Sequence, residues 1–469
     1  MKHIDIATVL QDKTLIGSRV TVCGWVRTSR DSSAVAFLEV TDGTSFSRLQ
    51  VVVDKSKFAL DPECAKCGAS VAATGVVVKA FKGEGAELNA ESVTLLGRCP
   101  NDYPIQKKRT TLDFLRTIPH LRLRTNTFSA VFRVRSVAAQ AIHRYFHANR
   151  FYYIHTPLIT ASDCEGAGEM FRVTTQPWDA KYESEAAYYK DDFFGQKAGL
   201  SVSGQLEGEV AAMALGRIYT FGPSFRAENS NTTRHLAEFW HVEPEIAFAE
   251  LPEVMEIAEE MIKYVVRAVL EECPAEMDFF EKFVEPGLKA KLQNIVESKF
   301  AVLDYTDAIE LLKKADVKFQ FPVEWGCDLQ TEHEKYITEQ VYKKPVFVVN
   351  YPKEIKSFYM KQNPDGKTVA ATDLLVPGIG EIIGGSEREA DPEKLLAAMQ
   401  ARNMDLASYE QYLDLRKFGT APHGGFGLGF DRFVMYVTGM ENIRDVVLFP
   451  RTVKNIRMSR MFKLARAPC

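Results

Sequence analysis

The stretch YTFGPSFRAENSNTTRHLAEFWHVEPE, residues 219–245, decides the fold and indicates the chemistry of this chain. Two apolar segments flank a loop rich in Asn, Thr and Arg, and this pattern predicts a β-hairpin with a long tip. Because side chains alternate between the faces of a strand, Arg226 and Glu228 share one face. One face of the return strand carries Phe239, His241, Glu243 and Glu245. A guanidinium, an aromatic ring and carboxylates on one sheet face predict a site for a phosphate, a flat base and an amino group.

A second unusual segment, GGFGLGFDR at residues 424–432, supplies glycines for close backbone approach and a further arginine. A third, ATDLLVPGIGEIIGGSERE at 371–389, places Asp373 and Glu381 near a run of glycines. Carboxylate oxygens suit a Mg²⁺ ion that bridges the oxygens of a triphosphate. Taken alone, this third segment is explained equally well as a solvated acidic loop. Together, the three segments predict an enzyme that binds a nucleotide.

Length and composition set the broad class. A chain of 469 residues exceeds what one hydrophobic core organises, so we expect two or more domains. A net charge of −4 argues against a protein that coats nucleic acid. No apolar run approaches the ~20 residues that cross a bilayer, and the N-terminus lacks signal-peptide features, which predicts a cytoplasmic location. The lone CxxC of Cys64 and Cys67 has no second pair, so reduced thiols are favoured over a zinc site.

The chain is organised into two predicted domains and a linker. Short strand-like segments between residues 17 and 97 have the spacing of a small all-β barrel. We expect a barrel domain at 1–104, a basic hinge at 105–126, and an α+β domain at 127–469 on a mainly antiparallel sheet flanked by helices. Apolar periodicity predicts helices from about 126 to 149 and at 251–272. FYYIHTPLIT, residues 151–160, predicts a strand ended by proline.

In sequence order, three segments resemble the motifs of the class II aminoacyl-tRNA synthetases. FYYIHTP resembles motif 1 (about 140–160), FRAE with EFWHVEPE resembles motif 2 (219–245), and GFGLGFDR resembles motif 3 (422–450). The segments GWVRTSRD, AFLEVTD and LQVVV are similar to the OB-fold anticodon-binding domain of the aspartate, asparagine and lysine subgroup. SDCEGAGEMF (162–171) and DFFGQKAGLSVSGQLEGE (192–209) are most similar to its asparagine-specific members.

This resemblance implies an activity and an assembly. The activity is ATP-dependent activation of L-asparagine to asparaginyl-adenylate, followed by transfer to the 3′-terminal adenosine of tRNA(Asn). The assembly is a homodimer, because motif 1, which ends here at Pro157, lies at the two-fold interface of class II enzymes. No general base is needed, since the amino acid's own carboxylate attacks the α-phosphorus. His423, in a glycine-flanked loop, is expected to be a flexible gate.

The resemblance also implies how ATP is held. Arg226 would bind the α-phosphate, and Glu228 would accept a hydrogen bond from the adenine amino group. Phe239 would stack under the base. Arg432 would cover the other face of the base and reach the γ-phosphate. His235, in the hairpin loop, would touch the terminal phosphates.

Two further sets of residues follow from the same resemblance. Asp373 and Glu381 would hold Mg²⁺, although they lie eight residues apart where the aspartate enzymes have a spacing of seven. Glu381 is therefore the better supported of the two ligands. Glu165, together with Gln205, would fix the α-amino group of the substrate.

The substrate side chain is selected by charge, because asparagine and aspartate are nearly isosteric. Arg388 would donate to the side-chain carbonyl of either amino acid. The aspartate enzymes carry a lysine three residues past the match to Gln205, whereas this chain has Gly208. Glu243 would then be free to accept from the carboxamide NH₂ and would repel a carboxylate. A buried like-charge contact costs several kcal/mol, which corresponds to roughly a thousandfold discrimination or more.

For the tRNA, the barrel resemblance implies that Phe37 stacks on an anticodon base while Gln50 reads the edge of a base. Arg27 would meet a phosphate in the same region. A plain core position in the barrel remains the alternative for Phe37.

Three alternatives to the main hypothesis remain open at this point. The first is an aspartyl-tRNA synthetase with relaxed specificity, against which Gly208 and Glu243 argue. The second is a paralogue that uses the adenylate for ammonia transfer, a group that lacks the barrel. The third is an RNA-binding protein with an inactive synthetase domain, which the intact set of Arg226, Glu381 and Arg432 disfavours.

Overall fold

The computed structural model describes residues 2–81, 85–106, 110–165, 169–230 and 232–456. By its contacts the chain divides into two compact units, Met1–Phe132 with Met458–Cys469, and Arg133–Arg457. The division lies within α4 (Asn126–Ala148), the first of the two predicted helices. The predicted hinge at 105–126 contains two short helices, α2 (Leu112–Arg116) and α3 (Pro119–Arg122). Its residues 107–109 lie outside the described part of the chain.

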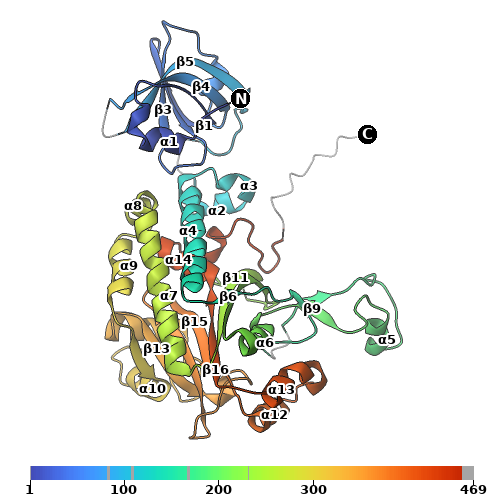
Figure 1. Ribbon diagram of the computed structural model, residues 1–469. Coiled ribbons are helices and arrows are strands. Elements are labelled where there is room, and N and C mark those ends of the chain that lie inside the picture. The colour runs from blue at the N-terminus through green and yellow to red at the C-terminus, as the bar shows by residue number, and fades with distance from the viewer. Residues whose placement is uncertain (1, 82–84, 107–109, 166–168, 231, 457–469) are drawn as a thin grey trace. The chain divides into compact units, whose positions relative to one another are not determined.

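The smaller unit contains a closed five-stranded barrel with the strand order β1-β2-β3-β5-β4 (Figure 1). Alternate side chains of β2 and β3 are buried, as expected where one face of a strand lines a core. The strands fall on the segments predicted from the sequence, which confirms the barrel: β1 (Arg19–Asp31), β2 (Val35–Thr41), β3 (Leu49–Asp54), β4 (Ser70–Lys79) and β5 (Ala86–Gly97).

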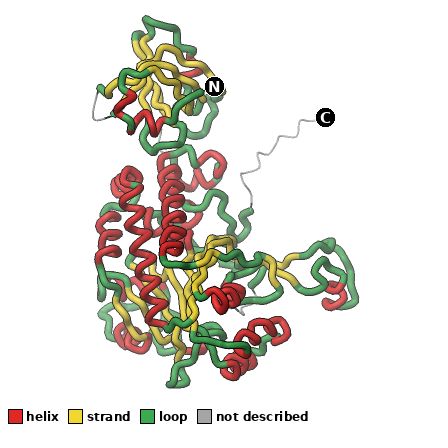
Figure 2. Tube along the Cα trace, in the orientation of Figure 1, coloured by secondary structure: helices red, strands yellow, loops and turns green. Residues whose placement is uncertain are grey.

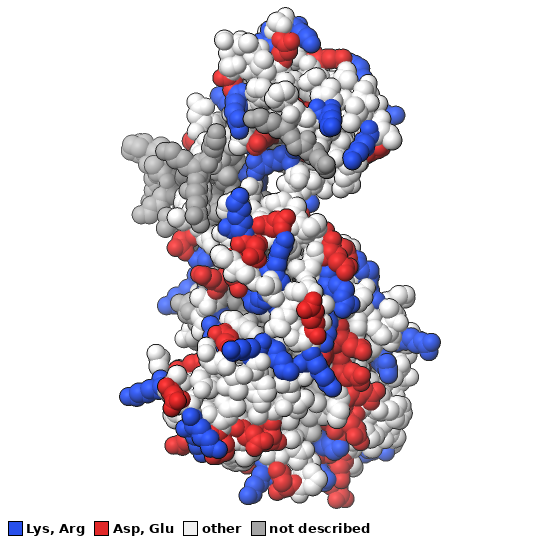
Figure 3. Space-filling model, turned by 90° about the vertical axis from the view of Figure 1, so that its left-hand side faces the viewer, with Lys and Arg blue, Asp and Glu red and all other residues white. Residues whose placement is uncertain are grey.

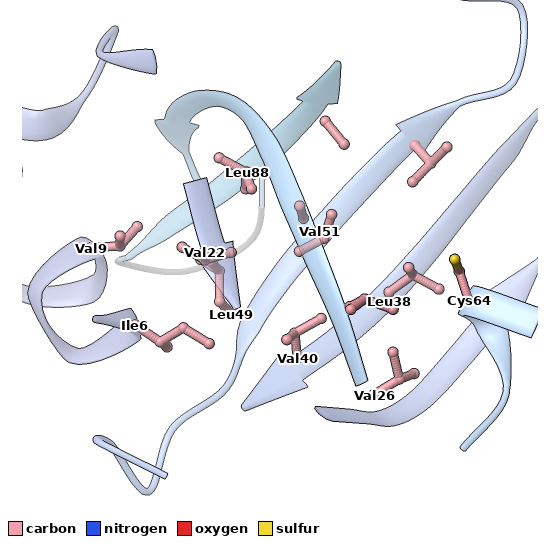
Figure 4. Close-up of a cluster of buried hydrophobic side chains, with 14 of the residues drawn as sticks. Ile6, Val9, Val22, Val26, Leu38, Val40, Leu49, Val51, Cys64 and Leu88 are labelled. Atoms are coloured by element: carbon pink, nitrogen blue, oxygen red, sulfur yellow. The ribbon is translucent and has the colours of Figure 1, made fainter. Parts of the chain in front are cut away.

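The barrel core is built from aliphatic side chains (Figure 4). Ile6 and Val9 of helix α1 (Ile6–Gln11) join the strand residues in this core. Cys64, from the short 3-10 helix Pro62–Ala65, is buried in the same cluster. Cys67 instead donates a hydrogen bond from Sγ to the carbonyl of Arg27 at 3.1 Å. The two thiols of the CxxC segment therefore have separate structural environments.

The larger unit is built on an eight-stranded sheet with the order β12-β13-β14-β15-β16-β11-β10-β6. Its pairs are antiparallel except for β12 with β13 and β10 with β6, which confirms a mainly antiparallel sheet. The strands are β6 (Tyr152–Tyr153), β10 (Arg217–Phe225), β11 (Glu238–Ala247), β12 (Ala301–Asp304), β13 (Val346–Pro352), β14 (Thr368–Val376), β15 (Gly380–Glu387) and β16 (His423–Gly429).

Helices lie around this sheet (Figure 2). The second predicted helix, α7 (Leu251–Glu272), packs against β14, β15 and β16 through its apolar side, and α6 (Gln205–Leu215) contacts β10 and β11. None of the helices in the described residues is long and apolar enough to span a membrane. The remaining helices are α8 (Pro274–Phe283), α9 (Leu288–Glu297), α10 (Tyr305–Lys313), α11 (Thr331–Lys335), α12 (Pro392–Ala401), α13 (Glu410–Lys417) and α14 (Phe430–Thr438).

The strand predicted in FYYIHTPLIT, ended by proline, is shorter in the structure than the apolar segment. Only Tyr152–Tyr153 pairs in the large sheet, as β6, and Ile159–Thr160 forms β7 of a separate sheet. Pro157 between them has no N–H to donate, so one ladder cannot run through it. The second sheet has the order β7-β9-β8, with β8 (Arg172–Val173) and β9 (Ala198–Leu200), and helix α5 (Glu185–Lys190) lies between these two strands in sequence.

The surface charge agrees with the composition. Acidic and basic side chains are interspersed over the face drawn in Figure 3, in keeping with the net charge of −4.

Candidate functional site

The larger unit contains a pocket of about 440 Å³ over the strands of its sheet. Every residue predicted to bind ATP, asparagine or metal lines it, so the structure brings these side chains together although their binding roles stay predictions. They are Glu165, Gln205, Arg226, Glu228, His235, Phe239, Glu243, Asp373, Glu381, Arg388 and Arg432.

The hairpin of β10 and β11 forms much of this pocket. The two strands pair in register from Arg217 opposite Ile246 to Phe225 opposite Glu238. Beyond the ladder, the Arg226 N–H donates to the carbonyl of Ala237 at 3.0 Å, so the backbone stays paired at the predicted phosphate residue. Local alternation along the strands thus places the motif 2 side chains on the pocket face.

Arg226 is prepared to receive an anion. Its Nη2 lies 3.7 Å from Glu165 Oε1, and its guanidinium lies 5.4 Å from the centre of the Phe239 ring. Its Nε is buried without a hydrogen-bond partner among the described residues. Burial lowers the pKa of Arg226, but Glu165 and Glu228 outweigh it and raise the pKa above its ordinary value. Arg226 therefore lines the pocket as a charged group with one hydrogen-bond donor unused, which suits a phosphate-binding arginine.

Arg432 is positioned by its neighbour in α14. Asp431 accepts hydrogen bonds from Arg135 of α4 and from the backbone N–H of Trp240 at 2.7 Å, which ties α14 to β11. Arg432 Nη1 donates to the Glu381 carbonyl at 3.0 Å and lies 3.9 Å from Glu381 Oε2.

A cluster of cations surrounds the hairpin loop. Burial, together with Arg432, Arg226 and Arg234, lowers the pKa of His235, so this imidazole is neutral in the absence of an anion. Arg234 lines the pocket as well, and burial with Arg432 lowers its pKa. Arg226, Arg234 and Arg432 all line the pocket, and three guanidinium groups close to one another indicate a site for a multiply charged anion such as a triphosphate.

The carboxylates of the two predicted metal ligands, Asp373 and Glu381, lie close to the same space. A Cβ atom at Gly384 would lie 3.2 Å from Glu381 Oε1 and 3.6 Å from Asp373 Oδ1, so both carboxylates reach the space that this glycine leaves open. A register shift between Leu374 and Leu375 in the β14–β15 pair accommodates their spacing of eight residues. In addition, Lys356 Nζ donates to both oxygens of Asp373, at 2.7 and 2.9 Å.

These residues fit Mg²⁺ only as part of a larger coordination shell. Among the described residues, no group of three or more metal-ligating side chains is close enough to hold an ion alone. Mg²⁺ usually takes one or two carboxylates and completes its shell with water and substrate phosphates. Burial and Asp373 raise the pKa of Glu381, and burial with Glu381 and Asp373 raises that of Glu334 to about 8. Such mutual repulsion among carboxylates is relieved by a bound cation.

The Glu243 carboxylate was predicted to be free to accept a hydrogen bond from the substrate, and in the structure it is not free. Its carboxylate, 5% exposed, already accepts four hydrogen bonds from the protein. The donors are Ser203 Oγ, the Gly204 N–H at 3.0 Å, Thr220 Oγ1 at 3.0 Å and His241 Nδ1 at 3.1 Å. Burial raises the pKa of Glu243, but His241, Ser203 and the Gly204 N–H together lower it to about 2. An ionised carboxylate this deeply buried requires donors, which explains why it is not free.

Arg388 belongs to a buried ionic network behind the pocket. It binds Glu245 through two hydrogen bonds, Nη2 to Oε1 at 2.5 Å and Nε to Oε2 at 3.2 Å. Glu209, fully buried, accepts from Arg416 at 2.7 Å and is bonded to His423 Nε2 at 2.9 Å. These contacts hold the Arg388 guanidinium at the pocket wall, where a substrate carbonyl would meet its remaining N–H groups.

The prediction of His423 as a flexible gate is wrong. His423 is fully buried as the first residue of β16, with Nδ1 bonded to the Ala421 carbonyl and Nε2 bonded to Glu209. An imidazole held at both nitrogens inside a sheet cannot swing. The flanking glycines instead make room for neighbours, because a Cβ at Gly424 would lie 2.7 Å from Val254 of α7.

Gln205 and Glu165 offer acceptors to an ammonium group. Gln205 donates from Nε2 to Glu209 Oε1 at 3.0 Å, which directs its carbonyl oxygen away from that carboxylate. Glu165 accepts from Ser357 Oγ at 3.0 Å. Both residues line the pocket, as expected for a pair that fixes an α-amino group. Gly208, on α6, packs toward Ile218 and the side chain of Glu245.

On the barrel, Phe37 is 37% exposed on the outer face of β2, so the core alternative for this residue is excluded. Gln50 faces the same side, since it pairs opposite Glu39, and its Nε2 donates to Glu87 Oε1 at 3.0 Å. Arg27 is half-buried at a register shift of β1, where burial and Arg48 lower its pKa. The structure thus presents an aromatic ring and an amide together on one surface.

Three pocket residues escaped the sequence analysis as functional candidates, namely Arg234, His241 and Lys356, and so did Glu334, whose Oε2 lies 3.4 Å from the backbone N of Glu381. Arg234 adjoins His235, and His241 shares the strand face of Glu243, so the sequence pattern of the hairpin could have identified both as pocket residues. Glu334 and Lys356 lie outside all three motif segments, and only the tertiary structure brings them to Glu381 and Asp373.

Comparison with known proteins gives a consistent result. Residues 112–453 match the family model described as tRNA synthetases class II (D, K and N), and residues 20–96 match that of the OB-fold nucleic acid binding domain. The chain is 54% identical over 450 residues to the asparagine–tRNA ligase of Clostridium novyi, covering 93% of this chain and 95% of that one. It is 54% identical over 461 residues to that of Desulfitobacterium hafniense, covering 97% and 99%. Among solved structures, asparaginyl-tRNA synthetase from Pyrococcus horikoshii complexed with asparaginyl-adenylate is similar, with 33% identity, a TM-score of 0.84, and coverage of 97% and 99%.

Proposed function

This chain belongs to the class II tRNA synthetases for aspartate, lysine and asparagine, and we propose that it is the asparagine enzyme of its cell. It activates L-asparagine with ATP to asparaginyl-adenylate and transfers the asparaginyl group to tRNA(Asn), releasing AMP and pyrophosphate. The observation that carries this proposal is one pocket that contains all the side chains predicted to bind ATP, asparagine and metal, with an anionic Glu243 and no lysine at position 208.

In the activation step the chain acts by binding and orientation. On one side of the pocket, Phe239 provides an aromatic ring for stacking and Arg226 provides hydrogen-bond donors for a phosphate. Arg432 provides a second guanidinium from α14. Gln205 and Glu165 hold the α-amino group, so the substrate carboxylate is aligned with the α-phosphorus for in-line attack. Mg²⁺, held by Asp373 and Glu381, would neutralise charge on the phosphates as pyrophosphate leaves. Arg226 stabilises the charge that develops on the α-phosphoryl oxygens.

Selection of the amino acid rests on the opposed charges of the pocket wall. Arg388, fixed by Glu245, donates to the side-chain carbonyl oxygen of the substrate. Glu243, kept ionised by its donors, makes that part of the wall negative. A neutral carboxamide can accept from Arg388 beside this negative wall, whereas the carboxylate of aspartate meets a like charge.

The barrel reads the tRNA. Phe37 stacks on an anticodon base and Gln50 contacts its edge, while Arg27 supports the phosphate backbone. Reading splayed bases on an aromatic surface is the common mode of OB-fold recognition.

The functional unit is a homodimer. Around motif 1, several large apolar side chains are exposed in the isolated chain: Tyr152, Leu158, Ile159 and Trp240. An exposed apolar group of this kind fits a self-complementary two-fold interface.

Amino-acid-dependent ATP–pyrophosphate exchange, followed by charging of tRNA(Asn), tests the proposal. Exchange with asparagine and formation of Asn-tRNA are expected. Equal exchange with aspartate would instead make the chain a non-discriminating aspartyl enzyme, and exchange without any tRNA charging would indicate a different use of the adenylate.

A further inference from the structure

Lys356 makes an ion pair with one of the two predicted metal ligands. Its Nζ donates to both carboxylate oxygens of Asp373, at 2.9 Å to Oδ1 and 2.7 Å to Oδ2. The two side chains are only 17% and 16% exposed, so solvent and salt screen this ion pair little. A positive charge of the protein therefore lies directly on the oxygen atoms that a magnesium ion would use.

Several contacts hold Lys356 in this position. Its ammonium lies 4.0 Å from the centre of the Tyr351 ring on β13. Arg402, which follows α12, donates from Nη2 to the carbonyls of Lys353 and of Lys356 itself, at 3.1 and 3.0 Å. These bonds fix the backbone that carries the Lys356 side chain. Burial lowers the pKa of Lys356, but the nearby carboxylates outweigh it and raise the pKa above its ordinary value, so the group is an ammonium at neutral pH.

The other predicted ligand, Glu381, has a looser contact with its cation. Arg432 Nη1 lies 3.9 Å from Glu381 Oε2, which is too long for a hydrogen bond, and it donates to the Glu381 carbonyl instead. Asp373 is thus the ligand that a direct ion pair holds. Because both carboxylates reach the space beside Gly384, a cation that enters this space competes with Lys356 for Asp373.

This competition favours a divalent ion only when a nucleotide accompanies it. Two positive groups that share one carboxylate repel each other, most strongly where little water separates them. The ammonium also neutralises Asp373, which then attracts a hydrated ion weakly. A triphosphate supplies both the negative charge and the additional oxygens with which Mg²⁺ completes its coordination shell.

We propose that Lys356 is a positioning residue that holds Asp373 in place for the magnesium ion of ATP and keeps a divalent ion from binding there before the nucleotide. Without the ammonium, Asp373 and Glu381 would offer two carboxylates to one space, which favours a cation on its own. The inference rests on the proposed function, because it concerns the ATP site of that activity. Its test involves neither asparagine nor tRNA.

The test is a titration of the full-length protein with Mn²⁺ in the absence of ATP, in which electron paramagnetic resonance measures the free ion. Lys356→Met removes the ammonium and keeps an unbranched side chain, whereas Lys356→Arg keeps the positive charge. The double variant Lys356→Met with Glu381→Gln locates any new binding. Circular dichroism and Tm check the fold of each protein.

Lys356→Met should bind one Mn²⁺ ion at least about tenfold more tightly than the wild type, because the competing cation is gone. Added Mn²⁺ should accordingly raise the Tm of this variant more than that of the wild type. Lys356→Arg should stay within about threefold of the wild type, since it restores the charge. The double variant should lose the gain, because one of the two carboxylates is removed.

Unchanged or weaker Mn²⁺ binding in folded Lys356→Met overturns the inference. An equal gain in Lys356→Arg, or a gain that persists in the double variant, overturns it as well. If the Met variant does not fold, Lys356→Gln takes its place and the same outcomes decide. Failure of the wild type to exchange pyrophosphate with asparagine would refute the proposed function and would leave the Mn²⁺ result unaffected.

Discussion

Neutralising Glu243 is the sharpest test of the pocket electrostatics. The fold lowers the pKa of this carboxyl from 4.5 to about 2, even though burial alone raises it. This lowering of the Glu243 pKa corresponds to about 3 kcal/mol by which the native environment favours the ionised form. In Glu243→Gln, an NH₂ group replaces one of the two carboxylate oxygens, so the donor on that side, either Ser203 at Oε1 or Thr220 at Oε2, is left facing an NH₂ group.

We expect two results from this substitution. The variant should lose about 3 kcal/mol of stability near neutral pH, seen as a lower Tm. Its preference for asparagine over aspartate in pyrophosphate exchange should fall roughly a hundredfold, since the repulsion of a carboxylate is removed. Glu243→Asp is the matched control, because it keeps the charge and should keep rejecting aspartate even if exchange slows.

The pH dependence has a definite sign. A carboxyl whose folded pKa lies below its unfolded value contributes stability above the unfolded pKa of about 4.3, and that contribution is lost as the pH falls toward the folded value of about 2. The Tm difference between the wild type and Glu243→Gln should therefore be full at pH 7 and shrink from about pH 5 downward. Identical substrate preference in the two proteins, or a Tm gap that widens in acid, would refute this reasoning.

Further predictions concern other parts of the molecule. Phe37→Ala should raise the KM for tRNA(Asn) about tenfold or more, because ~1–3 kcal/mol of stacking is lost, and should leave pyrophosphate exchange unchanged. Leu96→Ala, at another exposed barrel position, should change neither the KM for tRNA(Asn) nor pyrophosphate exchange. Glu381→Gln should shift the Mg²⁺ concentration needed for half-maximal exchange upward, and an unshifted Mg²⁺ titration would remove Glu381 from the proposed ligands. Glu209→Gln should lower stability by about 3–5 kcal/mol in thermal unfolding, because it leaves buried Arg416 without its charged partner. Ile159→Glu should convert a dimer to a monomer in sedimentation, and a monomeric wild type would contradict the proposed assembly.

The sequence by itself determined most of the elements, and its family resemblance supplied the candidate residues of the pocket. Period-two alternation is a local property of a strand, so the placement of Phe239 and Glu243 on one face of the return strand followed from their spacing alone. Apolar periodicity likewise located α7 at its observed bounds, 251–272. The strand predicted in 151–160, ended by proline, pairs in the large sheet only at Tyr152–Tyr153, because pairing depends on a partner strand, which the composition of the segment does not reveal.

Only the tertiary structure decided how the charged groups in the pocket are partnered. Ser203 reaches Glu243 across 40 positions of sequence, and Glu209 meets His423 across 214. The expectation of a free Glu243 and a mobile His423 failed on these long-range contacts. The physical reason is desolvation: a buried charge must find donors wherever the fold brings them, so spacing along the chain cannot encode which group satisfies it.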